Sequence, residues 1–330
     1  MGKSLRRIIL KSVYLVHSNL FSIIFVIVFQ FGCSARQIFI PYDKHIQAKI
    51  VVDGIERSFH YYLPTSYNPK NPLPVIFILH GGGGSPQSMI NLTRISDHAE
   101  RKNFIAVYPQ GYGNRWNDGR GIQGSIADEK NIDDEKFILN LKSFFINNFS
   151  TDSGRFGILG FSNGGFMTWK LACSEQNEFH KYSSVAAGIS VPIYNQCKPK
   201  HYKSMLLIFG EKDEVVPFSG GKIQTSLNGK TSYLGETKSY YDSLDFWSRI
   251  NSCQNQNTEF ISDVNRKDSK AILKTTYKNC ASNVELEGYA IKNLNHIWPN
   301  GFYYHSENNF GYLSSEIDAS ELIIDFMLTR

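Results

Sequence analysis

Residues 157–165 read Gly-Ile-Leu-Gly-Phe-Ser-Asn-Gly-Gly. The apolar start of this stretch predicts a buried strand, and the apolar segment 166–172 after it predicts a helix. Gly160, Ser162 and Gly164 therefore place a G-x-S-x-G pattern in the strand–turn–helix context that exposes a nucleophilic serine. Small residues on both sides of the serine let strand and helix approach, and the helix N-terminus favours negative charge. The alternative is a glycine-rich loop whose serine has no chemical role.

Two later loops offer the remaining members of a Ser-His-Asp triad. Asp213 lies just past a predicted strand downstream of Ser162, where the acid of such a triad belongs, and Glu211 is the second choice. His296 lies on a loop after the last predicted strand, and His305 is its nearest rival. The order Ser, Asp, His along the chain is the order found in α/β-hydrolases. An acid in a charged loop is otherwise usually a solvated surface residue, so the assignment depends on this order.

A second glycine-rich loop follows another predicted buried strand. The strand covers residues 75–79, and His80 then leads into four consecutive glycines at 81–84. Backbone N–H groups in such a loop can approach a ligand closely, as half of an oxyanion hole requires. We expect His80 to be a structural hydrogen-bonding residue and not a catalyst. The alternative for the whole loop is a flexible connector.

Strands and helices alternate along the rest of the chain, which predicts an α/β fold with a mostly parallel sheet. Asp53-Gly54 predicts a hairpin turn. Asp133 and Asp134 open a helix, and we interpret them as capping residues. We expect strands at 48–52, 58–63, 75–79, 104–108, 156–159, 184–189, 205–209, 274–277 and 286–291, helices at 90–102, 135–149, 166–172, 238–250 and 315–328, and a loop at 194–202.

The composition is that of a globular protein: among 330 residues, 42% are hydrophobic and 20% are charged. The formal net charge of +5 comes mostly from four basic residues near the N-terminus, where no acid offsets them. The remainder of the chain is nearly neutral. It therefore gives no basis for a nucleic-acid partner.

Residues 1–33 predict an export signal. A positive segment at 3–11 precedes an apolar segment at 20–29 that is short for a membrane span. An uncleaved anchor is the alternative. Cys33 after a glycine resembles a lipoprotein signal in which this cysteine is lipidated, although Gln30 departs from that pattern. Cleavage near 34–35 would instead release the protein. We expect a single domain from 34 to 330, outside the cytoplasm.

The cysteines beyond the signal indicate disulfides. Cys173, Cys197, Cys253 and Cys280 allow three pairings, of which we favour the two that are local in sequence, 173 with 197 and 253 with 280. Free buried thiols are the alternative and are less common in exported proteins. The sequence has no Cys-x-x-Cys pair and no histidine cluster with zinc spacing.

Several motifs in one order resemble the secreted esterases grouped as polyhydroxybutyrate depolymerase and feruloyl esterase relatives, within the α/β-hydrolase fold. The resemblance covers about residues 50–301. The motifs are Leu79-His80-Gly81-Gly82, Tyr108-Pro109-Gln110-Gly111 with Trp116-Asn117, Asp133-Asp134, Gly160-Phe161-Ser162-Asn163-Gly164-Gly165, Leu171-Ala172-Cys173, Gly210-Glu211-Lys212-Asp213 with Val216-Pro217, and His296-Ile297-Trp298-Pro299.

The resemblance implies a role for each site residue. Ser162 is the nucleophile, Asp213 the acid and His296 the base, and the N–H groups of Gly82 and Asn163 form the oxyanion hole. It also implies the two disulfides favoured above, and helices on both faces of the sheet.

Two tryptophans are candidates for the substrate pocket. Trp116 lies in a glycine-rich loop beyond a strand, where it either walls the pocket or only packs the loop, and Trp298 follows His296 closely. Relatives carry Gly-Gly-His before Thr-Trp-Pro-Gly, whereas this chain has Asn295 before its histidine and Asn300 before Gly301. The pocket near Trp298 is therefore where this chain departs from the family.

We predict an exported serine carboxylic-ester hydrolase, acting through an acyl-enzyme on feruloyl or other aryl esters or on hydroxyalkanoate esters. It needs no metal or organic cofactor. We expect a monomer whose partner is a small or polymeric ester, with a membrane tether through Cys33 if that cysteine is lipidated. The alternatives are a serine peptidase of the same fold and an exported binding protein with a decayed site.

Overall fold

The structure is a computed structural model that describes residues 39–175, 179–227, 230–261, 271–301 and 317–329. The predicted export signal, Cys33 and His305 lie outside these residues, so the predictions made for them stay predictions. Within the described residues, no helix combines the length and the apolar character that crossing a bilayer requires.

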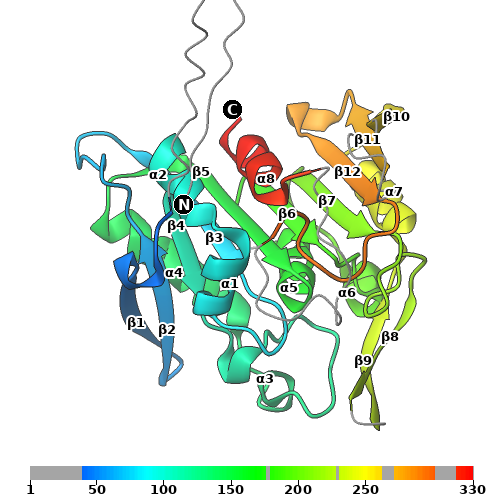
Figure 1. The fold of residues 1–330 in the computed structure, drawn as a ribbon, viewed down its shortest axis with the longest axis horizontal. Helices are drawn as coiled ribbons and strands as arrows, with labels where there is room; N and C mark the ends of the chain where they lie inside the picture. The colour runs from blue at the N-terminus through cyan, green and yellow to red at the C-terminus, as the bar shows by residue number, and fades with distance from the viewer. Residues whose placement is uncertain (1–38, 176–178, 228–229, 262–270, 302–316, 330) are drawn as a thin grey trace, which may run out of the picture. The chain divides into compact units, whose positions relative to one another are not determined.

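Twelve strands occur in the described part of the chain (Figure 1). The ten-stranded sheet contains β1 (Ile46–Val52), β2 (Ile55–Tyr62), β3 (Leu73–Leu79), β4 (Ile105–Pro109), β5 (Thr151–Phe161), β6 (Lys181–Val185), β7 (Ser204–Gly210), β10 (Asn255–Ile261), β11 (Ile272–Lys278) and β12 (Leu286–Ile291). A separate two-stranded sheet contains β8 (Gly221–Leu227) and β9 (Lys230–Thr237).

Helices and short 3-10 turns connect these strands. The α-helices are α1 (Pro86–Thr93), α2 (Ile95–Lys102), α3 (Ile126–Glu129), α4 (Asp134–Asn148), α5 (Asn163–Cys173), α6 (Val191–Gln196), α7 (Tyr240–Ile250) and α8 (Ala319–Leu328). The 3-10 helices are η1 (Tyr42–Lys44), η2 (Tyr112–Asn114) and η3 (Ala281–Asn283).

The large sheet has the order β1-β2-β4-β3-β5-β6-β7-β12-β11-β10. Its central strands, from β4 to β12 in this order, run parallel, while β1, β2, β10 and β11 pair antiparallel at the two edges. The carboxyl ends of β3, β5, β7 and β12 therefore open onto one edge of the sheet, the edge at which α/β proteins bind ligands. The predicted α/β fold with a mostly parallel sheet is confirmed.

The central strands are buried on both faces because helices cover both. Alternate residues of β3 point to opposite sides, Val75, Phe77 and Leu79 into one apolar cluster and Ile76 and Ile78 into the other. The first cluster also takes side chains from α4, α5, α6 and α7, and the second from α1, α2 and α8. Continuous apolar strands are the sequence signature of this two-sided burial.

The turn between β5 and α5 is a close backbone approach. A methyl group on Gly160 would lie 2.1 Å from the carbonyl oxygen of Gly164, and one on Gly164 would lie 2.4 Å from that of Leu79. Real side chains do not tolerate such distances. The glycines are therefore required for the strand, the helix and β3 to meet here, as the sequence predicted.

The β1–β2 turn and both disulfides match the prediction. Val52 pairs with Ile55 across Asp53 and Gly54, whose φ values of 53° and 76° suit a tight hairpin turn. Disulfide bonds join Cys173 to Cys197 and Cys253 to Cys280.

The helix predicted at 90–102 is wrong in its extent. The chain forms two helices there, because Ser85 and Pro86 start α1 earlier and Arg94 takes a left-handed conformation, with φ 50° and ψ 29°, that ends it. The strand predicted at 184–189 lies at 181–185 instead, and Ala186 leaves it with φ 55°. Helix α6 occupies the start of the predicted loop 194–202.

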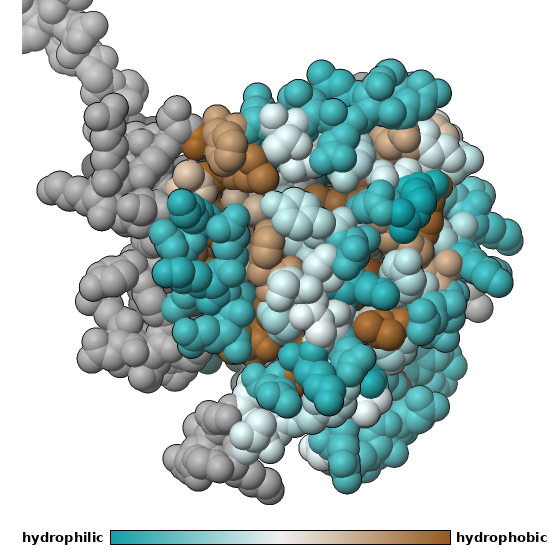
Figure 2. Space-filling view, turned by 90° about the vertical axis from the view of Figure 1, so that its right-hand side faces the viewer, coloured by the Kyte–Doolittle hydropathy of each residue, from teal (hydrophilic) through white to brown (hydrophobic). Residues whose placement is uncertain are grey.

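Neither the β8–β9 hairpin nor strand β10 was predicted from the sequence. Strand β10 is the sheet edge, and all of its residues, Asn-Gln-Asn-Thr-Glu-Phe-Ile, are exposed, so it lacks the apolar alternation that marks a strand. Figure 2 shows this side of the molecule as mostly hydrophilic, with small apolar areas between polar ones. Polar side chains on an edge strand discourage pairing with another sheet.

We expect Gly160→Ala to lower the free energy of unfolding by about 3 kcal/mol or more, because the new methyl group overlaps the Gly164 carbonyl. Gly154→Ala in the same strand is the matched control: its methyl group would meet only the Asp152 carboxylate at 3.3 Å, and it should cost less than about 1 kcal/mol. Urea unfolding followed by tryptophan fluorescence measures both. Equal losses would contradict this account of the turn.

Candidate active site

Ser162 lies between β5 and α5 in a strained backbone conformation. Its φ is 53° and its ψ is −117°, which L-residues rarely adopt. Its N–H donates to the carbonyl of Val185 on β6 at 2.9 Å, and its carbonyl accepts from the N–H of Phe166 at 3.0 Å. These bonds fix the turn from both sides and leave the hydroxyl at the carboxyl edge of the sheet.

His296 bridges the hydroxyl of Ser162 and the carboxylate of Asp213. Its Nε2 lies 2.9 Å from Ser162 Oγ, and its Nδ1 lies 2.7 Å from Asp213 Oδ2. Because a carboxylate accepts hydrogen bonds, Nδ1 carries the proton and Nε2 is left as an acceptor for the serine hydroxyl. The ring of Phe161 lies 5.1 Å from the imidazole, centroid to centroid, and covers one of its faces.

The Asp213 carboxylate is buried and held on both oxygens. Its side chain has 0% exposure, and Oδ1 accepts the N–H groups of Val215 and Val216 at 2.9 and 2.8 Å. Glu211, the second choice for the acid, is exposed at the turn after β7. The structure therefore brings Asp213 to the imidazole, and leaves Glu211 in solvent.

His80 connects the glycine loop after β3 to the loop after β4. Its Nε2 accepts the N–H of Gly111 at 2.9 Å, and its Nδ1 donates to the carbonyl of Gly81 at 2.8 Å. The N–H of Gly83 donates to the Asn114 carbonyl at 2.8 Å, which ties the same two loops. The loop is therefore fastened in place, and His80 takes a structural part in it.

The two residues predicted to supply oxyanion N–H groups lie beside each other. A methyl group on Gly82 would come within 3.6 Å of Asn163 Cβ. Asn163 is the first residue of α5, where main-chain N–H groups have no partner within the helix. Gly82 and Asn163 therefore lie side by side, next to the turn that carries Ser162.

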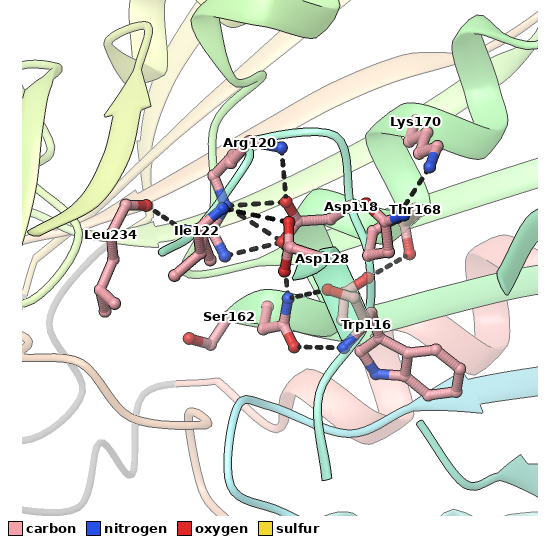
Figure 3. A network of polar contacts seen from close by, with 12 residues as sticks. Trp116, Asp118, Arg120, Ile122, Asp128, Ser162, Thr168, Lys170 and Leu234 are labelled. Atoms are coloured by element: carbon pink, nitrogen blue, oxygen red, sulfur yellow. Dashed lines mark hydrogen bonds and ion pairs between the residues drawn. The ribbon is translucent and has the colours of Figure 1, made fainter. Parts of the chain in front are cut away.

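The side chain of Asn163 belongs to a buried polar network with Trp116, Asp118 and Arg120, which Figure 3 labels. Its Oδ1 accepts the N–H of Trp116 at 2.9 Å, and its Nδ2 donates to the Trp116 carbonyl at 3.1 Å and to Asp118 Oδ2 at 2.5 Å. Asp118 has 0% exposure and forms an ion pair with Arg120, in which Nη2 lies 2.7 Å from Oδ2. Arg120 Nη1 donates in turn to the carbonyl of Leu234 on β9.

A family model described as "Putative esterase" matches residues 54–284, which is more than half of the chain. The chain belongs to this esterase family. The match includes Ser162 and Asp213 and ends before His296.

Two curated relatives of this family member are feruloyl esterases by name. "Probable feruloyl esterase C" of Aspergillus flavus is 29% identical over 183 residues, which cover 52% of this chain and 62% of that protein. "Feruloyl esterase B" of Thermothelomyces thermophilus is 33% identical over 139 residues, which cover 40% of this chain and 45% of that protein. The chain therefore aligns with less than two thirds of the length of either relative.

A solved structure supports the fold assignment. The acetyl xylan esterase from Aspergillus awamori superimposes with a TM-score of 0.50 at 12% identity, covering 76% of this chain and 94% of that one. At this identity the likeness concerns the fold alone. It agrees with the strand order and direction described above.

Both tryptophans proposed for the substrate pocket are buried in this family member. Trp116 has 0% exposure, and its indole N–H donates to the carbonyl of His80 at 2.9 Å. Trp298 has 1% exposure, and its indole N–H donates to Ser320 Oγ at 3.0 Å. Neither ring presents a surface to a substrate in this structure. Trp116 packs its own loop, which is the second of the two interpretations given for it. The prediction that these two rings wall the substrate pocket needs correction, because both are enclosed in the protein interior.

The two acidic residues at the start of α4, Asp133 and Asp134, have different roles. Asp133 caps the helix as predicted, accepting the N–H of Lys136. Asp134 instead is fully buried, lies 2.5 Å from Arg57 Nη2 and accepts the N–H of Asn117 at 2.8 Å. The prediction that Asp134 serves mainly as a capping residue is therefore wrong.

Sequence reasoning did not single out Asp118 and Arg120. The available signal was the string Asp118-Gly119-Arg120 directly after Trp116-Asn117, an acid and a base placed within a loop rich in glycine. A local pair of this kind normally indicates a solvated turn. The burial of the Asp118–Arg120 pair depends on contacts with distant elements, with Leu234 on β9 and with Asn163 on α5.

Burial lowers the pKa of His80 to about 4, against an ordinary value of 6.5. We therefore expect stability to fall as the pH decreases from about 6.5 to 4, because the unfolded chain binds a proton there that the folded protein does not. The loss from this residue is about 3 kcal/mol at pH 4.

Urea unfolding of the wild type and of His80→Gln at several pH values measures this loss. Other histidines contribute equally to both proteins, so the wild type should lose more stability than the variant over this pH range. Parallel curves for the two proteins would contradict a neutral, buried His80.

Proposed function

We propose that this chain is a serine carboxylic-ester hydrolase that works through an acyl-enzyme. The observation that carries the proposal is the hydrogen-bonded series from Asp213 through His296 to Ser162, at distances of 2.7 and 2.9 Å. Membership of the esterase family supports the same reaction. The strained turn and the helix N-terminus at the serine are further support, because both suit an attacking hydroxyl.

In the first step, His296 Nε2 takes the proton of Ser162 as Oγ attacks the ester carbonyl carbon. The imidazole becomes a cation, which the buried carboxylate of Asp213 stabilises through the 2.7 Å bond to Nδ1. The other oxygen of Asp213 accepts two main-chain N–H groups, which hold the carboxylate in place beside the imidazole. The same imidazolium then protonates the departing alcohol.

In this mechanism the N–H groups of Gly82 and Asn163 stabilise the oxyanion that forms on the carbonyl oxygen. Loss of one such donor typically raises the barrier by about 3 kcal/mol. In the second step, His296 removes a proton from water, which attacks the acyl-enzyme and releases the acid. The protein's own groups are sufficient for both steps.

The proposed substrates are feruloyl or other aryl esters, or hydroxyalkanoate esters. The names of the two curated relatives support the first class. The sequence resemblance to polyhydroxybutyrate depolymerases supports the second.

We also propose that the protein functions outside the cytoplasm as a single esterase domain at 34–330, after cleavage of its export signal either just before or just after Cys33. The two disulfides support this location, because such bonds persist in oxidising compartments. Cys33 would then either carry a lipid that tethers the protein or be removed with the signal. A monomer acting on a small or polymeric ester fits this proposal.

Ser162→Ala should abolish hydrolysis of aryl esters, with a loss of at least about 10³-fold in kcat, and leave the thermal midpoint within a few degrees of the wild type. A fluorophosphonate probe should label the wild type on Ser162 and leave the variant unlabelled. Ser88→Ala, in the N-terminal cap of α1, is the control for a serine outside the triad.

Unchanged turnover by Ser162→Ala would rule out the triad. A panel of 4-nitrophenyl and feruloyl esters against matched peptide amides separates an esterase from a peptidase with the same triad. A wild-type protein that resists the probe and turns over no member of the panel would indicate a binding protein with a decayed site.

A further inference from the structure

The side chain of Asn163 makes three hydrogen bonds, although the proposed reaction uses only its main-chain N–H. We propose that Asp118 and Arg120 are positioning residues, which hold Asn163 so that this N–H faces the developing oxyanion. This inference rests on the proposed function, in which Asn163 supplies one of the two donors.

The turn at Ser162 gives the side-chain contacts of Asn163 their importance. A residue with φ 53° and ψ −117° keeps that conformation only if its surroundings hold it there. The peptide that joins Ser162 to Asn163 carries the donor N–H. Three bonds from the Asn163 side chain to the loop at Trp116 and Asp118 therefore restrict the orientation of this peptide from the helix side.

Asp118 is suited to this task because its charge is buried and fully paired. Arg120 Nε lies 2.9 and 3.0 Å from the two carboxylate oxygens, and Nη2 lies 2.7 Å from Oδ2. Removing the charge of one partner in such a pair leaves the other buried and unpaired. The carboxylate therefore has one stable position, and its bond to Asn163 Nδ2 fixes the amide.

Arg120 extends the network to the β8–β9 hairpin. Its Nη1 donates to the Leu234 carbonyl at 3.0 Å (Figure 3). Its Cζ lies 3.9 Å above the ring of Phe166 in the first turn of α5. The guanidinium thus contacts both the helix that begins at Asn163 and the separate hairpin. A disturbance at Arg120 should reach the oxyanion donor through Asp118.

We expect Asp118→Asn to lower kcat by about tenfold to hundredfold on a small aryl ester and to change KM by less than about threefold. An oxyanion donor acts in the transition state, so its misplacement appears in kcat. Asn163→Ala keeps the N–H but loses the three side-chain bonds, and should give the same kcat loss. It serves as the second variant if Asp118→Asn does not fold.

Asp97→Asn is the matched control for a buried carboxylate. Asp97 pairs with Arg94 and accepts the N–H of Ile40, and it lies on α2, away from the serine. It should lower the thermal midpoint by a similar amount and keep kcat within about twofold. If the variants at 118 and 163 behave like Asp97→Asn, the network is only structural and this inference is overturned. Absence of ester turnover in the wild type would instead refute the proposed function.

A separate observation concerns Arg115, whose guanidinium lies against the glycine loop. A methyl group on Gly82 would come within 3.1 Å of Arg115 Nη1 and 3.4 Å of its Cζ. No acceptor for this guanidinium exists among the residues that the structure describes, in contrast to the paired Arg57, Arg94 and Arg120. A half-buried cation therefore stands next to a proposed oxyanion donor.

We infer that Arg115 binds a carboxylate on the substrate, and so selects esters that carry an anionic group near the scissile bond. A guanidinium presents several N–H donors in one plane, which matches the two oxygens of a carboxylate. Neutral feruloyl esters and acetylated neutral sugars carry no carboxylate for the Arg115 guanidinium to bind. The inference narrows the substrate class of the proposed function and depends on it.

Two pairs of esters test this selection. One pair, 4-nitrophenyl hydrogen adipate and 4-nitrophenyl hexanoate, differs by a carboxylate on the acyl side, and the other, 4-acetoxybenzoate and 4-methylphenyl acetate, by one on the alcohol side. In at least one pair, the wild type should prefer the anionic ester in kcat/KM, and Arg115→Gln should reduce that preference by about tenfold. Lys130→Gln, at an exposed cation near Tyr112, is the control and should keep the preference.

Unchanged ratios in both pairs for Arg115→Gln would overturn the inference, and so would an equal loss on neutral and anionic esters. Continued turnover of the neutral esters shows in either case that the hydrolase itself is intact. Failure of the wild type on all four esters would count against the proposed function.

Discussion

The contact between the backbones of β5 and α5 is the constraint on which the site geometry depends. Gly160 and Gly164 let the strand, the helix and β3 meet at distances that no Cβ permits. Ser162 must then turn the chain within one residue, in a conformation that is unfavourable by itself. Its hydroxyl is held at the carboxyl edge of the sheet because the end of β5 and most of α5 are buried on either side of it.

Paired buried charges give the irregular loop after β4 its definite shape. Asp118 with Arg120 and Asp134 with Arg57 are each buried, and both carboxylates also take hydrogen bonds from amide groups. An unpaired charge in these positions would be costly, so each pair tolerates few arrangements. This specificity is what the proposed oxyanion donor needs, because a donor loose by a small distance loses most of its effect.

Local sequence patterns predicted the features whose causes are local. The Asp53-Gly54 turn, the buried strands at 75–79 and 205–209 and the glycines of the serine turn follow from backbone conformation and burial alone. The break at Arg94 and the edge strand β10 were not predicted. Neither has a local apolar signal, since a left-handed conformation at Arg94 ends one helix early and pairing with β11 defines the strand.

The sequence by itself determined the order of Ser162, Asp213 and His296, the glycines around the serine and the positions of the four half-cystines, because these depend on residue type and on spacing along the chain. Only the tertiary structure decided that Asp213 and not Glu211 meets the imidazole, and that Trp116 is enclosed by the interior. Those outcomes depend on which side chains lose contact with water. That loss is set by residues far away in the sequence, which no local pattern records.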